Sequence, residues 1–180
     1  MMRVQLLDKV FEISITEARI VNAIKSIAKK IARDLRDKDP LLICVLNGSF
    51  MFASDLMKEM SFNCEISFVK LSSYEGTHTT GKVKQLIGLN EDIKGRYVVL
   101  LEDIVDTGTT IVKVVDQLRN LEPAEVRVAT MLFKPEAYTQ DMKIDYIGLE
   151  IPNDFIVGYG LDYNGYGRNL RNIYTVVEPE

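Results

Sequence analysis

One segment of the chain restricts its fold more than any other, because it combines a buried strand, an acidic cluster and a helix start. Residues 98–101 form an unbroken apolar run that is too short for a helix, which predicts a strand buried on both faces. Glu102 and Asp103 follow where this strand is expected to end, and residues 106–110 read Asp-Thr-Gly-Thr-Thr. Residues 111–118 then place apolar side chains at helical spacing. The segment predicts a strand, an acidic glycine-containing loop and a helix N-terminus.

The chemistry of this loop favours a sugar phosphate. Small hydroxylated residues around a glycine, at 107–110, let backbone N–H groups converge, and the helix dipole adds positive potential for a phosphate. The adjacent carboxylates of Glu102 and Asp103 could accept from the two hydroxyls of a ribose, or could bind magnesium, which prefers oxygen ligands.

The same pattern of strand, loop and helix recurs along the chain. Apolar runs at 41–46, 64–71 and 126–133 predict further buried strands, and residues 16–36 and 50–57 have helical spacing. Alternating strands and helices predict an α/β fold with a parallel sheet, whose ligands bind at the carboxyl ends of the strands. The first helix is expected to start with a capping box from Ser14 to Glu17, or with Thr16 as its cap, and residues 4–15 predict an irregular or strand-like arm.

Composition limits the class of protein. A chain of 180 residues with 47% hydrophobic content predicts a single domain, 1–180. A net charge of −4, from 22 basic and 26 acidic residues, argues against nucleic acid as a partner. No apolar run is long enough for a membrane span, there is no pattern of a secretory leader, and Cys44 and Cys64 lie in apolar runs as reduced core residues would, so we expect a cytoplasmic protein.

Residues 76–82 suggest a competing function, because they fit the pattern G-x-x-x-x-G-K of a phosphate-loop triphosphatase. Two observations argue against it: Val83 stands where that loop needs serine or threonine, and residues 83–87 alternate as a strand does. His78, in the same polar stretch, is expected to be a solvated side chain with no catalytic role.

Residues 101–110, which read Leu-Glu-Asp-Ile-Val-Asp-Thr-Gly-Thr-Thr, resemble the phosphoribosyl pyrophosphate signature of type I phosphoribosyltransferases. Further matches, over roughly residues 41–171, narrow the resemblance to hypoxanthine-guanine phosphoribosyltransferases. The resemblance implies a central, mostly parallel sheet flanked by helices, with a small hood from the chain ends. The core would span about residues 16–150 and the C-terminal part of the hood about 151–180.

The resemblance also implies roles for residues outside the signature. Asn47 and Gly48 fall in the pyrophosphate loop, where the family often has lysine or arginine instead of Asn47, and Ser72 and Tyr74 fall in a mobile lid. The residues expected to bind phosphoribosyl pyrophosphate are Glu102, Asp103, Asp106, Thr107, Gly108, Thr109, Thr110, Asn47, Gly48 and Arg168. Those expected at the purine are Lys134, as a donor to its 6-oxo group, Phe155, as a stacking ring, Ile156 and Asp162, and those expected at the metal are Glu102, Asp103 and Asp162.

The implied reaction is a step of purine salvage catalysed by a magnesium-dependent pentosyltransferase. The 5-phosphoribosyl group would pass from phosphoribosyl pyrophosphate to N9 of hypoxanthine or guanine, giving IMP or GMP and pyrophosphate. Asp106 is the candidate acid/base, because a carboxylate beside the base can take the purine N7 proton. The family implies a homodimer or homotetramer. A xanthine-preferring transferase and a non-catalytic regulator of the same fold remain the alternatives.

Overall fold

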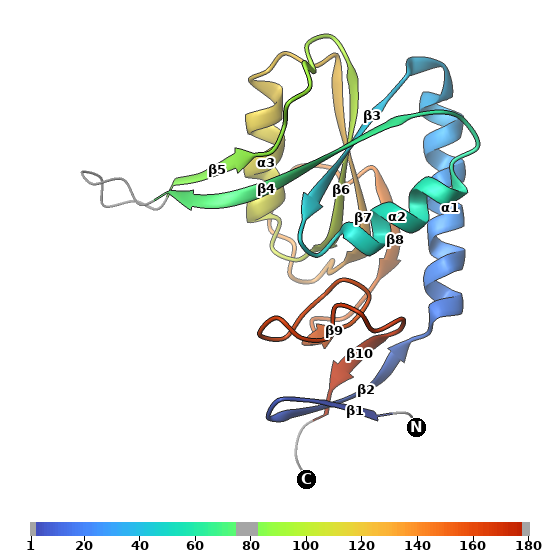
Figure 1. Cartoon of the computed structure of the whole chain (residues 1–180), viewed down its shortest axis with the longest axis vertical. Coiled ribbons are helices and arrows are strands. Elements are labelled where there is room, and N and C mark those ends of the chain that lie inside the picture. Colours follow the sequence, from blue (N-terminus) through green and yellow to red (C-terminus); the bar gives the residue numbers. More distant parts are fainter. Residues whose placement is uncertain (1–2, 75–82, 178–180) are drawn as a thin grey trace.

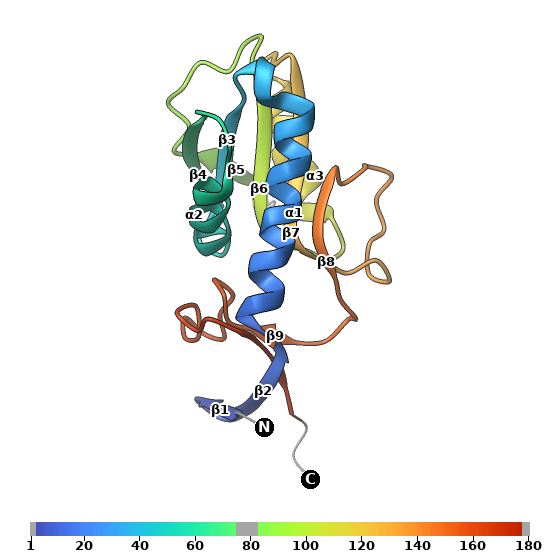
Figure 2. The same cartoon turned by 90° about the vertical axis from the view of Figure 1, so that its right-hand side faces the viewer.

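The computed structural model describes residues 3–74 and 83–177, with the backbone alone at 72–74 and 83–87. A six-stranded sheet carries helices on both of its faces, and a smaller four-stranded sheet lies beyond one end of it (Figure 1). Both chain ends lie at this smaller sheet (Figures 1 and 2). The predicted α/β fold with a hood is confirmed.

The large sheet has the strand order β5-β4-β3-β6-β7-β8. Every neighbouring pair is parallel except β4 with β5, which is antiparallel. The bounds of its strands are β3 Leu41–Leu46, β4 Glu65–Tyr74, β5 Val83–Ile87, β6 Tyr97–Val105, β7 Glu125–Phe133 and β8 Tyr146–Glu150. The last of these strands, β8, begins at Tyr146 and ends at Glu150, just before the residues expected to form the C-terminal part of the hood.

The central strands are buried on both faces, because alternate side chains of each strand enter different cores. Helices α1 (Glu17–Leu35) and α2 (Phe50–Glu59) cover one face, and α3 (Thr109–Arg119) covers the other. The buried side chains of β3 and β6 in the first core are Leu42, Cys44, Val99 and Leu101, and those in the second are Leu41, Ile43, Val45, Val98, Leu100 and Val105. The apolar runs of the sequence are therefore two interleaved sets of core residues.

The start of α1 differs from the sequence prediction. Thr16 is the N-cap residue, but neither it nor a capping box from Ser14 provides a side-chain cap. The backbone N–H of Glu17 instead donates to Oδ1 of Asn172, at 2.8 Å. A residue of the hood thus binds a free N–H group of the helix, and Arg171 adds an ion pair with Glu17 at 3.1 Å. A short 3-10 turn, η1 (Arg36–Lys38), follows α1.

The hood is an antiparallel sheet built from both ends of the chain, in the order β1-β2-β10-β9. Its strands are β1 Arg3–Leu6, β2 Lys9–Ile15, β9 Ile156–Val157 and β10 Ile173–Val176. The arm expected at 4–15 is therefore a hairpin, and its Phe11 is fully buried against the C-terminal segment. Figure 2 shows α1 running from the hood along the large sheet, which ties the two sheets together.

The segment that was expected to be a lid lies at the far edge of the large sheet. The backbones of Ser72 and Tyr74 pair with Gln85 and Val83 in an antiparallel ladder. Val83 begins a strand and not a helix, as its alternating pattern predicted, which disfavours the phosphate-loop interpretation. His78 and the whole of that motif, residues 76–82, lie outside the described residues. Within the described part of the chain no helix is long and apolar enough to cross a membrane.

Candidate active site

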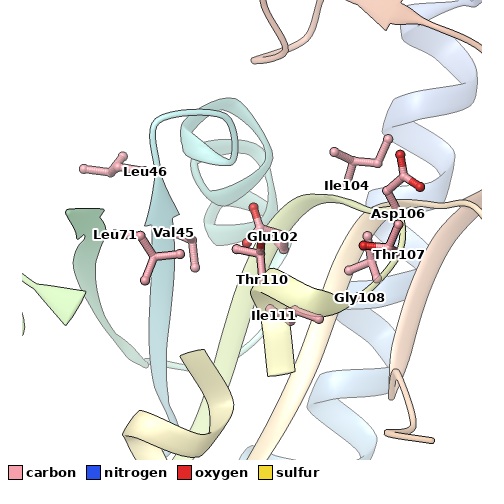
Figure 3. A pocket seen from close by; sticks show the side chains of 11 residues that line it. Val45, Leu46, Leu71, Glu102, Ile104, Asp106, Thr107, Gly108, Thr110 and Ile111 are labelled. Atoms are coloured by element: carbon pink, nitrogen blue, oxygen red, sulfur yellow. The ribbon is translucent and has the colours of Figure 1, made fainter. Parts of the chain in front are cut away.

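A pocket of about 280 Å³ opens at the carboxyl ends of the central strands (Figure 3). It lies at the end of β6 and the start of α3, where the sequence predicted a phosphate site. Backbone N–H groups in the first turn of a helix have no partner within that helix, so they are available to an anion. The polar residues that line the pocket are Glu102, Asp106, Thr107 and Thr110, and Gly108 lies among them.

The acidic pair lies within β6 and not beyond it, because this strand continues to Val105. Glu102 is opposite Thr130 of β7 and only 9% exposed. Burial raises the pKa of Glu102 well above its ordinary value, and the neighbouring charge of Asp103 raises it further. The carboxyl of Asp103 accepts from the N–H of Ile104 at 2.8 Å. An acidic pair of this kind, with Glu102 buried and Asp103 partly exposed, suits hydroxyl donors or a cation.

The loop at 107–110, where the sequence predicted a phosphate site, is supported by a segment that the sequence did not reveal. The carbonyl oxygen of Thr107 accepts from the backbone N–H and the hydroxyl of Thr139 and from Nε2 of Gln140, each at 3.3 Å. Gly108, the N-cap of α3, has φ +82°, and a Cβ there would overlap with the ring of Tyr138. Only glycine meets both conditions without strain. No local pattern marks residues 138–140, because their role comes from packing beside the loop.

Lys134 lies directly against the candidate acid/base. It is 7% exposed at the end of β7, and its Nζ is 3.3 Å from Oδ2 of Asp106. The same Nζ donates to Oδ1 of Asn153, also at 3.3 Å. The two residues that the sequence placed at the base therefore form one ion pair. Asn153, which sequence reasoning missed, fixes the ammonium group from a second direction.

The pyrophosphate loop is bounded by two other parts of the chain. Gly48 follows β3 and lies so close to Asp103 that a Cβ at Gly48 would overlap with the carboxylate. A Cβ on Gly160, in the hood, would overlap with the carbonyl oxygen of Gly48. The Leu46–Asn47 peptide bond is cis. The structure thus brings Gly48, Asp103 and Gly160 of the hood into contact at one end of the sheet.

Two charged residues of the hood pair with each other beside this contact. Nη2 of Arg168 is 2.6 Å from Oδ1 of Asp162, and Nη1 of Arg168 donates to the carbonyl oxygen of Gly160 at 2.7 Å. The N–H of Gly165 donates to the second oxygen of Asp162 at 2.7 Å. The guanidinium is therefore held close to Gly160 and, through it, close to the pyrophosphate loop.

The aromatic residue expected at the purine is partly free. Phe155 is 46% exposed, and its ring lies 5.7 Å from the ring of Tyr163 and 6.1 Å from that of Phe11. Ile156, the next residue, is in β9 and pairs with Thr175 of β10. A ring that packs against other aromatic rings and is partly open to solvent can stack on a planar base.

Comparison with known proteins agrees with this geometry. A family model described as a phosphoribosyl transferase domain matches residues 14–164. A hypoxanthine-guanine phosphoribosyltransferase of Streptococcus thermophilus is 38% identical over 168 residues, which are 93% of each chain. The chain belongs to the hypoxanthine-guanine phosphoribosyltransferase family. The corresponding protein of Lactococcus lactis is 37% identical over 97% of this chain and 95% of its own.

Solved structures of this family have the same fold. A hypoxanthine-guanine phosphoribosyltransferase of Bacillus anthracis superposes with a TM-score of 0.84 at 35% identity, over 94% of this phosphoribosyltransferase and 98% of its own chain. A hypoxanthine phosphoribosyltransferase of Trypanosoma cruzi has a TM-score of 0.84 at 33% identity, over 92% and 95% of the two chains.

The predicted metal ligands of this phosphoribosyltransferase do not form one cluster. Among residues 3–74 and 83–177, with the side chains of 72–87 excepted, no three histidine, cysteine, aspartate or glutamate side chains lie close enough to hold a metal ion together. Glu102 and Asp103 are adjacent on β6, whereas Asp162 is bound to Arg168 in the hood. The donors therefore fit a metal that takes one or two protein carboxylates, as magnesium usually does, with its other oxygen ligands from substrate and water.

Cys44 lies beneath the pyrophosphate loop, where its Sγ is 3.1 Å from the hydroxyl of Ser49. Burial raises the pKa of the Cys44 thiol to about 11, so the reactive thiolate is scarce at neutral pH. We expect Cys44 to resist alkylation at pH 8 until urea unfolds the protein, whereas Cys64, which is partly exposed, reacts in the native state. Peptide mapping after alkylation would show this difference between the two cysteines, and labelling of Cys44 in the native protein would contradict it.

The raised pKa of Cys44 also has a consequence for stability, because it favours the neutral thiol in the folded state. The contribution of this thiol to the free energy of unfolding should be complete below pH 9 and decline toward pH 11.

Proposed function

We propose that this phosphoribosyltransferase transfers the 5-phosphoribosyl group from phosphoribosyl pyrophosphate to N9 of hypoxanthine or guanine, which is a purine salvage reaction. The observation that carries the proposal is the ion pair of Lys134 and Asp106, whose charged atoms are 3.3 Å apart beside the phosphate loop. In a 6-oxopurine the O6 and N7 atoms are neighbours on one edge. A donor and an acceptor at this spacing fit both atoms at once.

Each member of the pair then has a defined task. The ammonium of Lys134 donates to O6, and the carboxylate of Asp106 takes the N7 proton as N9 becomes the nucleophile. Adenine presents an amino group in place of O6, and an ammonium cannot donate to it, so the site discriminates against adenine. Phe155 would stack on the base, and the backbone of Ile156 would meet its edge.

The sugar phosphate would lie across the end of β6. Backbone N–H groups and hydroxyls at Thr107, Gly108, Thr109 and Thr110 would bind the 5-phosphate, and Glu102 and Asp103 the ribose hydroxyls. Asn47, Gly48 and Arg168 would bind the pyrophosphate. Asp103, with Glu102 or Asp162, would hold Mg²⁺, which would neutralise charge on the pyrophosphate. Ser72 and Tyr74 would belong to a lid that excludes water from the reacting ribosyl carbon.

The compartment that we propose is the cytoplasm, because both cysteines are free thiols and disulfides are rare there. We also propose a homodimer or homotetramer, with neither nucleic acid nor a membrane as a partner. Phe50, at the start of α2, is 42% exposed, and Tyr166 in the hood is 59% exposed, which favours burial of these surfaces between copies of the chain. Sedimentation at several concentrations would test this assembly.

The test of function is the initial rate of nucleotide formation by the purified protein, with phosphoribosyl pyrophosphate and each of hypoxanthine, guanine, xanthine and adenine, with and without magnesium. We expect magnesium-dependent turnover of the first two bases and little of adenine. Faster turnover of xanthine would favour the xanthine-preferring alternative. Tight binding of the sugar phosphate without turnover of any base would favour the regulator.

A further inference from the structure

Tyr159 joins the hood to the helix that follows the pyrophosphate loop. Its side chain is buried, at 5% exposure, and its hydroxyl donates to Oδ2 of Asp55 at 2.7 Å. Asp55 is in α2, which begins at Phe50, directly after the loop. The carbonyl oxygen of Met51, also in α2, is 3.4 Å from the same hydroxyl. The two partners are 104 residues apart in the chain, so the contact is made only by the folded protein.

The residue after Tyr159 touches the pyrophosphate loop itself. Gly160 lies so close to the carbonyl oxygen of Gly48 that a Cβ would overlap with it. The N–H of Gly160 donates to the carbonyl oxygen of Arg168 at 3.0 Å, and its own carbonyl oxygen accepts from Nη1 of Arg168 at 2.7 Å. Gly160 therefore connects the guanidinium group of Arg168 to the backbone of the loop.

The backbone at this point needs support from elsewhere. Gly158, Tyr159 and Gly160 have φ values of +100°, +49° and +97°, and a left-handed backbone is unfavourable for a residue with a Cβ. A hydrogen bond to an ionised carboxylate is among the stronger polar contacts. Burial and the contact with Asp55 both raise the pKa of Tyr159, so its hydroxyl stays a donor at every working pH. The contact is therefore suited to hold the turn in this conformation.

We infer that Tyr159 is a positioning residue for the pyrophosphate site. Its hydrogen bond to Asp55 holds Gly160 against Gly48, and so keeps Arg168 and the pyrophosphate loop together before the ligand arrives. The inference rests on the proposed function, since it assigns the loop and Arg168 to pyrophosphate. A site that is already assembled avoids the loss of affinity that arises when only a fraction of the molecules is competent to bind.

Tyr159→Phe tests this inference, because it removes the hydroxyl and keeps the buried ring. Calorimetry would measure the binding of two probes to wild type and variant: magnesium pyrophosphate, and ribose 5-phosphate, which needs the loop at 107–110 and not Gly48. We expect the affinity for pyrophosphate to fall about tenfold, as it would if the assembled fraction fell to about one tenth. The affinity for ribose 5-phosphate should stay within about twofold, since its loop is not touched.

The chain offers a matched control in Tyr163, which donates to Oδ1 of Asp8 at 2.7 Å in the same hood but does not reach the pyrophosphate loop. Tyr163→Phe should leave the affinity for pyrophosphate unchanged. Asp55→Asn keeps an acceptor oxygen and should bind pyrophosphate almost as wild type does, whereas Asp55→Ala should weaken it as Tyr159→Phe does. The double variant Tyr159→Phe with Asp55→Ala should bind pyrophosphate no more weakly than the weaker single variant, because both changes remove the same hydrogen bond. Asp55→Ala also removes the surface ion pair with Lys58 at 2.9 Å, which does not reach Tyr159.

The outcomes separate the inference from the proposed function. If wild type makes nucleotide and binds pyrophosphate, and Tyr159→Phe binds pyrophosphate with equal affinity, the inference is overturned and the proposed function stands. An equal loss of affinity for both probes in Tyr159→Phe, together with a lower Tm, would also overturn the inference, because the contact would then only stabilise the fold. Wild type that binds no pyrophosphate and makes no nucleotide would overturn the proposed function and, with it, the inference.

Discussion

Replacement of Asp106 by asparagine is expected to lower kcat by about 10² to 10⁴-fold, the usual contribution of general acid–base catalysis. Asparagine has nearly the same shape and keeps an acceptor for Nζ of Lys134, which is 3.3 Å from Oδ2 in the native site. It cannot take a proton from N7. Affinity for phosphoribosyl pyrophosphate should therefore remain, since the loop at 107–110 and its support from residues 138–140 are unchanged.

The measurement is kcat by initial rates, together with the Kd of phosphoribosyl pyrophosphate by calorimetry. Asp116→Asn is the matched control, because Asp116 is in the adjoining helix α3 but its side chain is 62% exposed and pairs only at the surface with Arg119. This control should retain wild-type turnover. If Asp106→Asn also retains it, the proton transfer does not involve Asp106.

Replacement of Lys134 by methionine should strongly change the preference of the enzyme for 6-oxopurines over adenine. Methionine has a similar length but no donor, so the 6-oxo group loses a charged hydrogen bond, worth about 1.5–3 kcal/mol. We expect kcat/KM for hypoxanthine and guanine to fall by about 10 to 100-fold, with little change for adenine. The fall should be larger in kcat/KM than in the affinity for the sugar phosphate, which Lys134 does not contact in this proposal. Loss of the cation also leaves the carboxylate of Asp106 without its partner at 3.3 Å.

Competition between the four bases would measure this change in selectivity. Lys143→Met is a suitable control, because this side chain is 82% exposed and its ion pair with Asp145, at 3.7 Å, lies away from the pocket at the end of β6. It should alter no base preference. An unchanged ratio of hypoxanthine to adenine turnover in Lys134→Met would mean that another group reads the 6-position.

The local pattern of the sequence was sufficient for the elements that surround the site. The run at 41–46 is β3, with the same bounds, and the alternation at 83–87 is β5. The start of α3 after the glycine of the loop lies where the apolar spacing placed it. These elements are predictable because burial imposes a period of about two residues on a strand and 3.6 on a helix, and such a period is visible in a short stretch of chain.

Only the tertiary structure decided how these pieces meet. It extends β6 through Glu102 and Asp103, so that β7 buries the first of them, and it caps α1 with Asn172 in place of a local capping box. It also pairs Tyr159 with Asp55 and seats Gly160 on Gly48. Apart from the burial of Glu102 by β7, these contacts join residues more than 100 positions apart, and no local spacing records them. The sequence by itself determined the strands, the helices and the loop that the proposed function assigns to a sugar phosphate. The fold determined which of their residues touch, because contact depends on packing and not on order along the chain.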